Sequence, residues 1–150
     1  MKIAIIESPC APSNGYTREE HAAYLDRCIR WCVMRGYTPY ASHKMLVGPL
    51  DDDNGHQRQM GIGAGLSMSR QLAEALPVSW MFFVDHGISH GMQAAWEVCD
   101  VLLTTSRARN IQPMVVALDN QPEPDKRFGF AYQYDETAGL EGNARRARGE

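Results

Sequence analysis

Three clusters of polar residues each follow directly after a short apolar run, and their side chains carry groups that bind ligands or transfer protons. They supply carboxylates, hydroxyls, a thiol and imidazoles, together with glycines that let a backbone approach a ligand closely. If the runs are parallel strands, the clusters meet at one edge of the sheet, where α/β proteins bind ligands. The clusters are Glu7, Ser8 and Cys10 after residues 2–6, Ser42 and His43 after residues 37–41, and residues 85–92 after residues 80–84.

The third cluster, Asp-His-Gly-Ile-Ser-His-Gly-Met, has the composition of a turn that opens a helix. Ser89 is a favourable N-cap for that helix. Its hydroxyl and the N–H groups near Gly91 also form the kind of cradle that binds a phosphate, which the helix dipole favours. The two roles are compatible, so the candidate binding residues of this turn are Gly87, Ser89, Gly91 and Met92.

Three residues are candidates for acid–base or nucleophilic chemistry. Asp85, at the end of a strand, is either a catalytic carboxylate or a brace for the turn. His43 is the best-placed general acid or base, although a hydrogen-bonded structural histidine explains it equally well. Glu97 lies eight residues after Ser89, about 12 Å along a helix, and the alternative for it is an exposed surface position.

The acidic run Asp51–Asp53 follows the second apolar run at a distance that lets it face a bound sugar or a cation, but a solvated loop explains it as well. Arg58 either pairs with this run or donates two hydrogen bonds to a phosphate. Asp51, Asp52 and Arg58 are therefore further binding candidates. The glycine-rich segment 61–65 follows no strand and lacks the spacing of a dinucleotide motif. We interpret its glycines as residues that let a helix pack closely against the sheet.

Size and composition predict one cytoplasmic domain. The chain has 150 residues, 44% of them apolar, and a net charge of −3, which suffices for one core and gives no electrostatic reason to expect nucleic acid as the principal partner. No apolar run approaches the ~20 residues of a membrane span, and the N-terminus does not have the pattern of a signal peptide. In the cytoplasm we expect the four cysteines to be reduced thiols. The late basic residues form either a solvated tail or a phosphate-binding arm. They are Lys126, Arg127, Arg145, Arg146 and Arg148.

Apolar strands alternate with helical patterns, which predicts an α/β fold with a parallel sheet of four to five strands and helices on both faces. Beyond Asp119 the alternation stops. We expect a C-terminal extension there, residues 119–150, disordered over its last dozen residues, with 128–134 as an additional edge strand. The predicted strands are 2–6, 37–41, 79–84 and 113–118, and the predicted helices are 17–35, 57–76 (with Leu76 facing inward) and 90–103.

A set of motifs falls in a characteristic order along the chain. They are Glu7-Ser8-Pro9, Ala41-Ser42-His43, Leu50-Asp51-Asp52, Arg58, Gly61-Ile62, Ala64-Gly65-Leu66, Asp85, Gly87-Ile88-Ser89, Gly91-Met92 and Glu97. As a set they resemble a family of phage and bacterial proteins of uncharacterised function that is related to the nucleoside 2-deoxyribosyltransferases. The resemblance covers about residues 2–118. It implies a flavodoxin-like domain over residues 1–118.

The resemblance also implies an activity. Its relatives cleave the N-glycosidic bond of a deoxynucleoside or nucleoside monophosphate, or transfer the 2-deoxyribosyl group to another base. In the nucleotide-hydrolysing branch, the serine that contacts the 5′-phosphate is similar to Ser89. The ligand implied is a small nucleotide or nucleoside, with no cofactor and no metal, and the protein is expected to form a homo-oligomer. The reaction passes through an oxocarbenium-like sugar, so a carboxylate must attack the anomeric carbon or stabilise its charge.

One departure from the pattern bears on this activity. The nucleophilic glutamate of the superfamily falls four residues after the glycine that matches Gly91, where this chain has Ala95. Glu97 is turned about 200° further around a helix, and it reaches the site only if the helix starts late or is distorted. An alternative function is therefore a catalytically silent protein that binds or sequesters a nucleotide. A third is an interaction protein that binds a partner through the basic tail.

Overall fold

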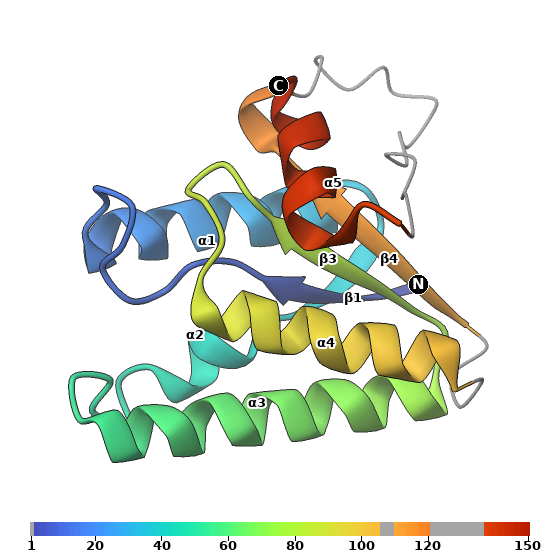
Figure 1. The fold of residues 1–150 in the computed structure, drawn as a ribbon. Coiled ribbons are helices and arrows are strands. Elements are labelled where there is room, and N and C mark those ends of the chain that lie inside the picture. The colour runs from blue at the N-terminus through green and yellow to red at the C-terminus, as the bar shows by residue number, and fades with distance from the viewer. Residues whose placement is uncertain (1, 106–109, 121–136) are drawn as a thin grey trace.

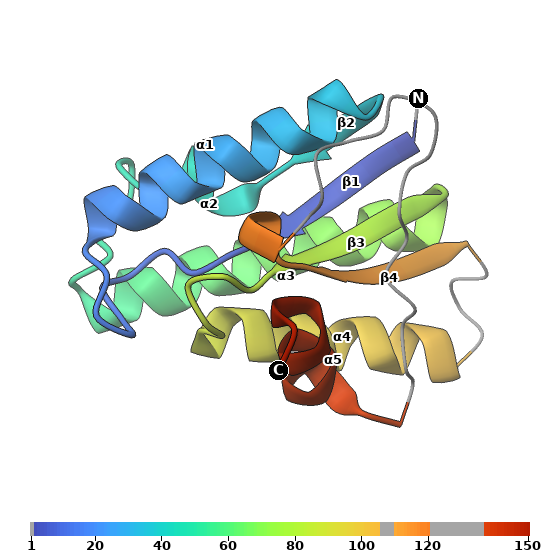
Figure 2. The same cartoon turned by 90° about the horizontal axis from the view of Figure 1, so that it is seen from above.

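Four parallel strands form one open sheet. Figure 1 shows the sheet among its helices, and Figure 2 shows the strand order β2-β1-β3-β4. The computed structural model describes residues 2–105, 110–120 and 137–150. Its strand order confirms the predicted α/β fold with a flavodoxin-like parallel sheet, in which the chain reverses its direction of winding between β1 and β3. The strands are β1 (Lys2–Glu7), β2 (Tyr37–Tyr40), β3 (Val78–Phe83) and β4 (Ile111–Val116).

Helices cover both faces of the sheet, as predicted (Figure 2). The helix α1 packs on one face with Ala4 and Ile6 of β1, whereas α4 and α5 pack on the other with Ile5. No helix in the described ranges is long and apolar enough to cross a membrane. The helices are α1 (Arg18–Met34), α2 (Ser42–Leu46), α3 (Gly55–Ala75), α4 (His90–Thr104) and α5 (Gly139–Arg148), with a 3₁₀ turn at Leu118–Asn120.

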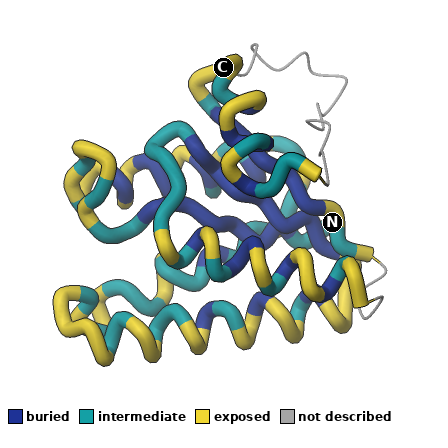
Figure 3. Tube along the Cα trace, viewed as in Figure 1, coloured by how far each residue is buried: buried dark blue, intermediate teal, exposed yellow. Residues whose placement is uncertain are grey.

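The position of each strand follows from its residues. All six residues of β3 are buried (Figure 3), which accounts for its continuous apolar run, since a central parallel strand is covered on both faces. The edge strands β2 and β4 each contain a proline, Pro39 and Pro113. Proline lacks the N–H that a central strand donates, so an edge tolerates it.

Helix starts agree with the local signals in the sequence. Thr17 caps α1 and forms a capping box with Glu20: the Glu20 N–H donates to Thr17 Oγ1 at 3.2 Å, and the Thr17 N–H donates to Glu20 Oε2 at 2.7 Å. Gly36 follows the helix end with φ +79°, a conformation that favours glycine. Ser89 caps α4 as predicted.

Three details of the predicted helices are wrong. The loop predicted from residue 44 begins with the short helix α2 instead. The next helix, α3, starts at Gly55, where Asn54 accepts hydrogen bonds from the N–H groups of His56 and Gln57. Leu76 does not face inward, because it follows the end of α3 and is 44% exposed.

The last dozen residues are not disordered, contrary to the sequence-based expectation. They contain α5, which buries Leu140, Ala144 and Ala147 against the sheet. Arg145, Arg146 and Arg148 therefore belong to a packed helix rather than to an extended arm, and Arg148 pairs with Glu150 at 2.9 Å. Lys126 and Arg127 lie outside the described residues. The predicted edge strand 128–134 lies outside the described residues.

The glycine-rich part of α3 packs against α2 and its following loop, not against the sheet as predicted. A Cβ atom on Gly65 would lie 2.6 Å from Ser42 Oγ and 2.9 Å from Ser42 Cβ, and one on Gly61 would lie 3.1 Å from Leu50 Cδ1. The absence of these Cβ atoms therefore sets how closely α2 approaches α3.

We expect Gly65→Ala to destabilise the protein by roughly 1–3 kcal/mol, because the added methyl group forces Ser42 and α2 to move. Gly63→Ala is the matched control: nothing lies within 4 Å of its added Cβ atom, and alanine in an exposed helix position should stabilise by up to about 1 kcal/mol. Urea unfolding measures both variants. Equal stability of the two would contradict this account of the α2–α3 contact.

Candidate functional site

A cavity opens where the loops that follow β1, β2 and β3 meet α3 and the start of α4. This is the point where strand order reverses, and such points bind ligands in open α/β sheets. We call it the site cavity. It is lined by Glu7, Ser8, Cys10, Ala11, Ser42, His43, Leu46, Val47, Leu50, Asp52, Gln57, Arg58, Gly61, Ile62, Leu66, Ser89, Gly91 and Met92.

The structure brings together most of the residues predicted from the sequence. Those that line the site cavity are Glu7, Ser8, Cys10, Ser42, His43, Asp52, Arg58, Ser89, Gly91 and Met92. Four candidates lie outside it, namely Asp51, Asp85, Gly87 and Glu97.

Glu7 supplies a buried carboxyl group to the cavity wall. It ends the central strand β1 and is 9% exposed. The indole Nε1 of Trp80, on the adjacent strand β3, donates a hydrogen bond to Glu7 Oε1 at 3.1 Å. Burial raises the pKa of Glu7 to about 7, and the Trp80 hydrogen bond opposes this only in part. The carboxyl group therefore exchanges its proton near neutral pH.

His43 and Ser8 form a pair that the sequence did not predict. Ser8 Oγ lies 3.0 Å from His43 Nε2. Burial lowers the pKa of His43 to about 4, with a further contribution from the charge of Lys44. The imidazole is therefore neutral at physiological pH, and a neutral ring nitrogen is able to accept a proton.

Ser89 caps α4, as predicted, and also lies at the site cavity. Its Oγ accepts a hydrogen bond from the Met92 N–H at 3.3 Å, which caps α4. At the same time Ser89, Gly91 and Met92 line the site cavity, so the N-terminal turn of α4 forms part of its wall. Unpaired N–H groups and the helix dipole make such a turn favourable for an anion.

Asp52 lies between two guanidinium groups. Arg18 Nη1 is 2.8 Å from Asp52 Oδ2, and Arg58 Nε is 4.0 Å from Asp52 Oδ1. Arg18 also pairs with Asp53 at 2.7 Å. The exposed Asp51 instead stabilises the turn, because its Oδ1 accepts a hydrogen bond from the Asp53 N–H at 3.1 Å.

Asp85 is hydrogen-bonded in a way that matches a bracing role. Its carboxylate accepts the N–H groups of Leu118 and Asp119, both at 2.9 Å, and the hydroxyl of Tyr24. These bonds tie the end of β3 to the turn that follows β4. The neighbouring Gly87 has φ +86°, and a Cβ atom there would lie 2.4 Å from Asn14 Nδ2. It is thus required by the contact between two loops.

An aromatic cluster beside this turn was missed in the sequence. The His86 ring stacks between Tyr16 and Tyr24, with ring centroids 3.8 and 4.1 Å away. His86 Nδ1 also lies 3.2 Å from Nδ1 of His21 on α1. These contacts hold the segment before α1 against the turn that precedes α4, and thereby fix two loops near the site cavity.

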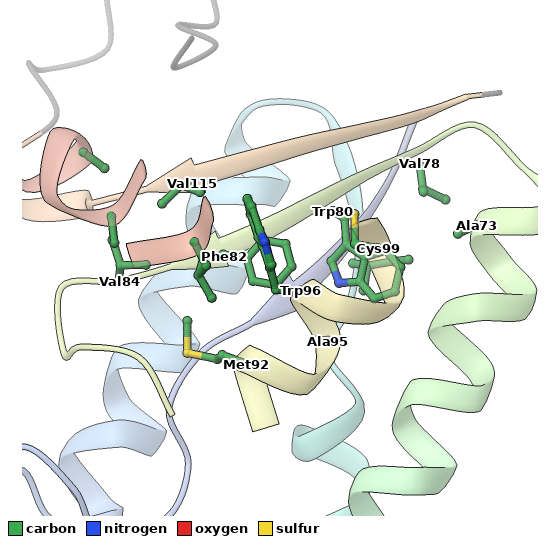
Figure 4. Close-up of a cluster of buried hydrophobic side chains, with 14 of the residues drawn as sticks. Ala73, Val78, Trp80, Phe82, Val84, Met92, Ala95, Trp96, Cys99 and Val115 are labelled. Carbon is green, nitrogen blue, oxygen red and sulfur yellow. The ribbon is translucent and has the colours of Figure 1, made fainter. Parts of the chain in front are cut away.

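Glu97 does not approach the site cavity. The helix α4 begins at His90, so neither a late start nor a distortion turns this side chain inward. Ala95 is fully buried beside Met92 and Trp96 on the sheet-facing side of α4 (Figure 4). Glu97 is exposed and lies with Arg70 in a separate groove between α3 and α4.

Comparison with known proteins identifies a family. A family model described as "Domain of unknown function (DUF7768)" matches residues 2–109. The chain belongs to this family. The matched range of DUF7768 includes every residue that lines the site cavity, whereas β4 and α5 lie beyond it. No curated protein and no solved structure matches the chain.

Within residues 2–105, 110–120 and 137–150, no group of three or more histidine, cysteine, aspartate or glutamate side chains is arranged to hold a metal ion. The four cysteines are free thiols, of which Cys10 lines the site cavity.

The bracing role of Asp85 predicts a loss of stability. In Asp85→Asn an amide NH₂ group faces a backbone or hydroxyl donor, so we expect destabilisation of roughly 1–3 kcal/mol. Asp100→Asn, the same change at an exposed position of α4, should change stability little. Urea unfolding compares the two. If Asp85→Asn were as stable as the control, the hydrogen bonds of Asp85 would not brace the turn.

The raised pKa of Glu7 predicts a pH dependence of stability. The unfolded chain ionises near the ordinary value of 4.5 and the folded chain near 7, so folding stability falls as pH rises through this interval. The shift in pKa corresponds to a loss on the order of 3 kcal/mol in the free energy of unfolding. Glu7→Gln removes this loss and should be more stable than the wild type at neutral pH but not below pH 4.5.

Urea unfolding across this pH range measures the difference between the two proteins. His43 affects both alike, since its lowered pKa makes stability fall as pH drops from 6.5 towards about 4. Glu19→Gln, at an exposed position of α1, controls for the chemical change. Parallel curves for the wild type and Glu7→Gln would contradict the raised pKa.

Proposed function

We propose that the site cavity binds a deoxynucleoside or nucleoside monophosphate and breaks its N-glycosidic bond, by hydrolysis or by transfer of the 2-deoxyribosyl group to another base. The observation that carries the proposal is the convergence of Ser8, Ser42 and Ser89, which follow three different strands, with Arg58 and a buried carboxyl group around a cavity whose other lining residues are mostly apolar. A nucleotide has matching parts: an anionic phosphate, a sugar with hydroxyl groups, and a flat base.

The phosphate is best accommodated beside α4. Ser89 and Gly91 place the N-terminal turn of this helix on the cavity wall, and phosphates bind favourably there. Arg58 adds a guanidinium group from α3, which can donate two parallel hydrogen bonds to phosphate oxygens. Its 4.0 Å separation from Asp52 is longer than a hydrogen bond and leaves its donors available for a ligand.

The base is best accommodated against the apolar part of the wall. Leu46, Ile62, Leu66 and Met92 line this part, and apolar side chains with a few polar groups are typical of small-molecule sites. Asp52 and Gln57 also line the cavity. Their oxygen and nitrogen atoms are suited to the sugar hydroxyls or to the edge of the base.

A second candidate function is binding without catalysis. The buried Ala95 and the exposed Glu97 favour it, because no carboxylate of α4 lines the site cavity. Under this alternative the protein binds or sequesters the same nucleotide without turnover.

We further propose that the protein acts in the cytoplasm as a homo-oligomer. Free thiols at all four cysteines fit a reducing compartment. The groove between α3 and α4 has apolar lining residues such as the exposed Val101, and oligomer interfaces commonly cover surfaces of this kind.

Incubation of the purified protein with each deoxynucleoside and its 5′-monophosphate, with and without an acceptor base, tests the function. Chromatography should detect released or exchanged base. Arg58→Gln should weaken binding of the monophosphate by roughly ten- to a hundredfold without affecting the nucleoside, since it removes a charge-assisted contact.

The matched control is Arg30→Gln, the same change at an exposed position of α1 that lies outside both the site cavity and the groove between α3 and α4. Binding without base release from any of these compounds would select the silent binder. If no compound binds, both candidate functions are wrong.

A further inference from the structure

We propose that Glu7 is the general acid that protonates the departing base. This inference rests on the proposed function and deepens it, because it assigns the catalytic carboxyl group to β1 instead of to α4. The reaction requires such a group: the base leaves with the electron pair of the glycosidic bond, and a proton delivered to it lowers the barrier.

Position first distinguishes Glu7 from the other carboxyl groups. Among the described residues, the carboxyl groups that line the site cavity are those of Glu7 and Asp52. Asp52 is paired with Arg18 at 2.8 Å, so its carboxylate is already engaged by a guanidinium group, whereas Glu7 has no such partner among the described residues. The carboxyl group of Glu7 has no ion pair within the part of the chain that the structure describes, and the one hydrogen bond of this side chain there comes from the neutral indole of Trp80.

Its surroundings keep Glu7 protonated near neutral pH. Burial raises its pKa to about 7, and the nearby titratable groups carry no charge there. The pKa of Tyr40 on β2 is raised, that of Cys99 on α4 is raised to about 12, and that of His43 on α2 is lowered to about 4. The charged groups that line the cavity are Asp52, which pairs with Arg18 at 2.8 Å, and Arg58, which lies 4.0 Å from Asp52.

The proposed step balances as follows. The bond between the anomeric carbon and the base nitrogen breaks, its electron pair goes to the base, and the Glu7 proton goes to the base with it. A water oxygen, or a nitrogen of an acceptor base, then forms a bond to the anomeric carbon. The proton that this nucleophile loses goes to solvent, from which Glu7 regains its own. Glu7 forms no covalent bond to the sugar, so the reaction does not require the glutamate that Ala95 replaces.

The test compares wild type and Glu7→Gln on two leaving groups. Gln keeps the size and the acceptor oxygen for Trp80 Nε1 but carries no acidic proton. On a natural deoxynucleoside or its monophosphate we expect the rate to fall by about a hundredfold or more. With 4-nitrophenyl 2-deoxyriboside carrying the same 5′ group we expect little change, because 4-nitrophenolate leaves without a proton.

A pH profile gives a second readout that a structural role would not produce. Above a pH of about 7 the wild-type rate should fall by about tenfold per pH unit as Glu7 ionises, whereas the residual rate of Glu7→Gln should lack this decline. Substrate affinity and urea unfolding show that the variant is folded and binds. Glu19→Gln, exposed on α1, should retain wild-type rates on both substrates.

The outcomes separate the two claims. Equal activity of Glu7→Gln and wild type on natural substrates overturns the role of Glu7 and leaves the proposed function standing. An equal loss on both leaving groups also overturns it, since an acid acts only on the group that needs a proton. Absence of turnover by the wild type on every substrate overturns the proposed function and this inference together.

Discussion

A buried carboxyl group at the end of the central strand is the constraint on which the site depends. Glu7 ends β1 between β2 and β3, where both faces of the sheet are covered and solvent has little access. The indole of Trp80 gives it one hydrogen bond, which only partly offsets the loss of hydration, and its pKa rises to about 7. An apolar residue in its place would pack more favourably. A buried carboxyl group that destabilises the fold and lies at a cavity wall is typical of a functional site.

The fold builds the cavity around this group by bringing distant segments together. Parallel strands place the residues that follow them at one edge of the sheet, and α2 approaches α3 closely because Gly65 has no side chain. Asp85 and the ring stack around His86 hold two further loops in position. These residues therefore shape the cavity by holding segments of the chain in position, and not by contacting a ligand. Polar residues such as Asp85 and His86 lie near the cavity without lining it, because their side chains make these structural contacts.

The features that could be predicted from the sequence are the strands and helix starts, because these depend on local patterns of residues. Continuous apolar runs indicated the strands, and the N-caps Thr17 and Ser89 act through bonds to residues three positions away. Pairs such as Ser8 with His43 are separated by 35 positions, so no local signal reveals them. The helix α5 was missed because it buries small alanines among arginines, a composition typical of exposed chain. The outward position of Glu97 could have been predicted from the sequence. One apolar stripe of α4 faces the core and leaves Glu97 on the opposite side of the helix. The stripe consists of Met92, Ala95, Trp96 and Cys99.

The most direct test of the central claim is a crystal structure of the protein with a bound deoxynucleoside monophosphate, obtained with Glu7→Gln to prevent turnover. The account predicts phosphate at the N-terminal turn of α4 beside Ser89 and Arg58, and the base nitrogen of the glycosidic bond, or an atom of the base that takes its proton, within hydrogen-bond distance of residue 7. A ligand bound in the groove beside Glu97, or one whose base points away from residue 7, would contradict it.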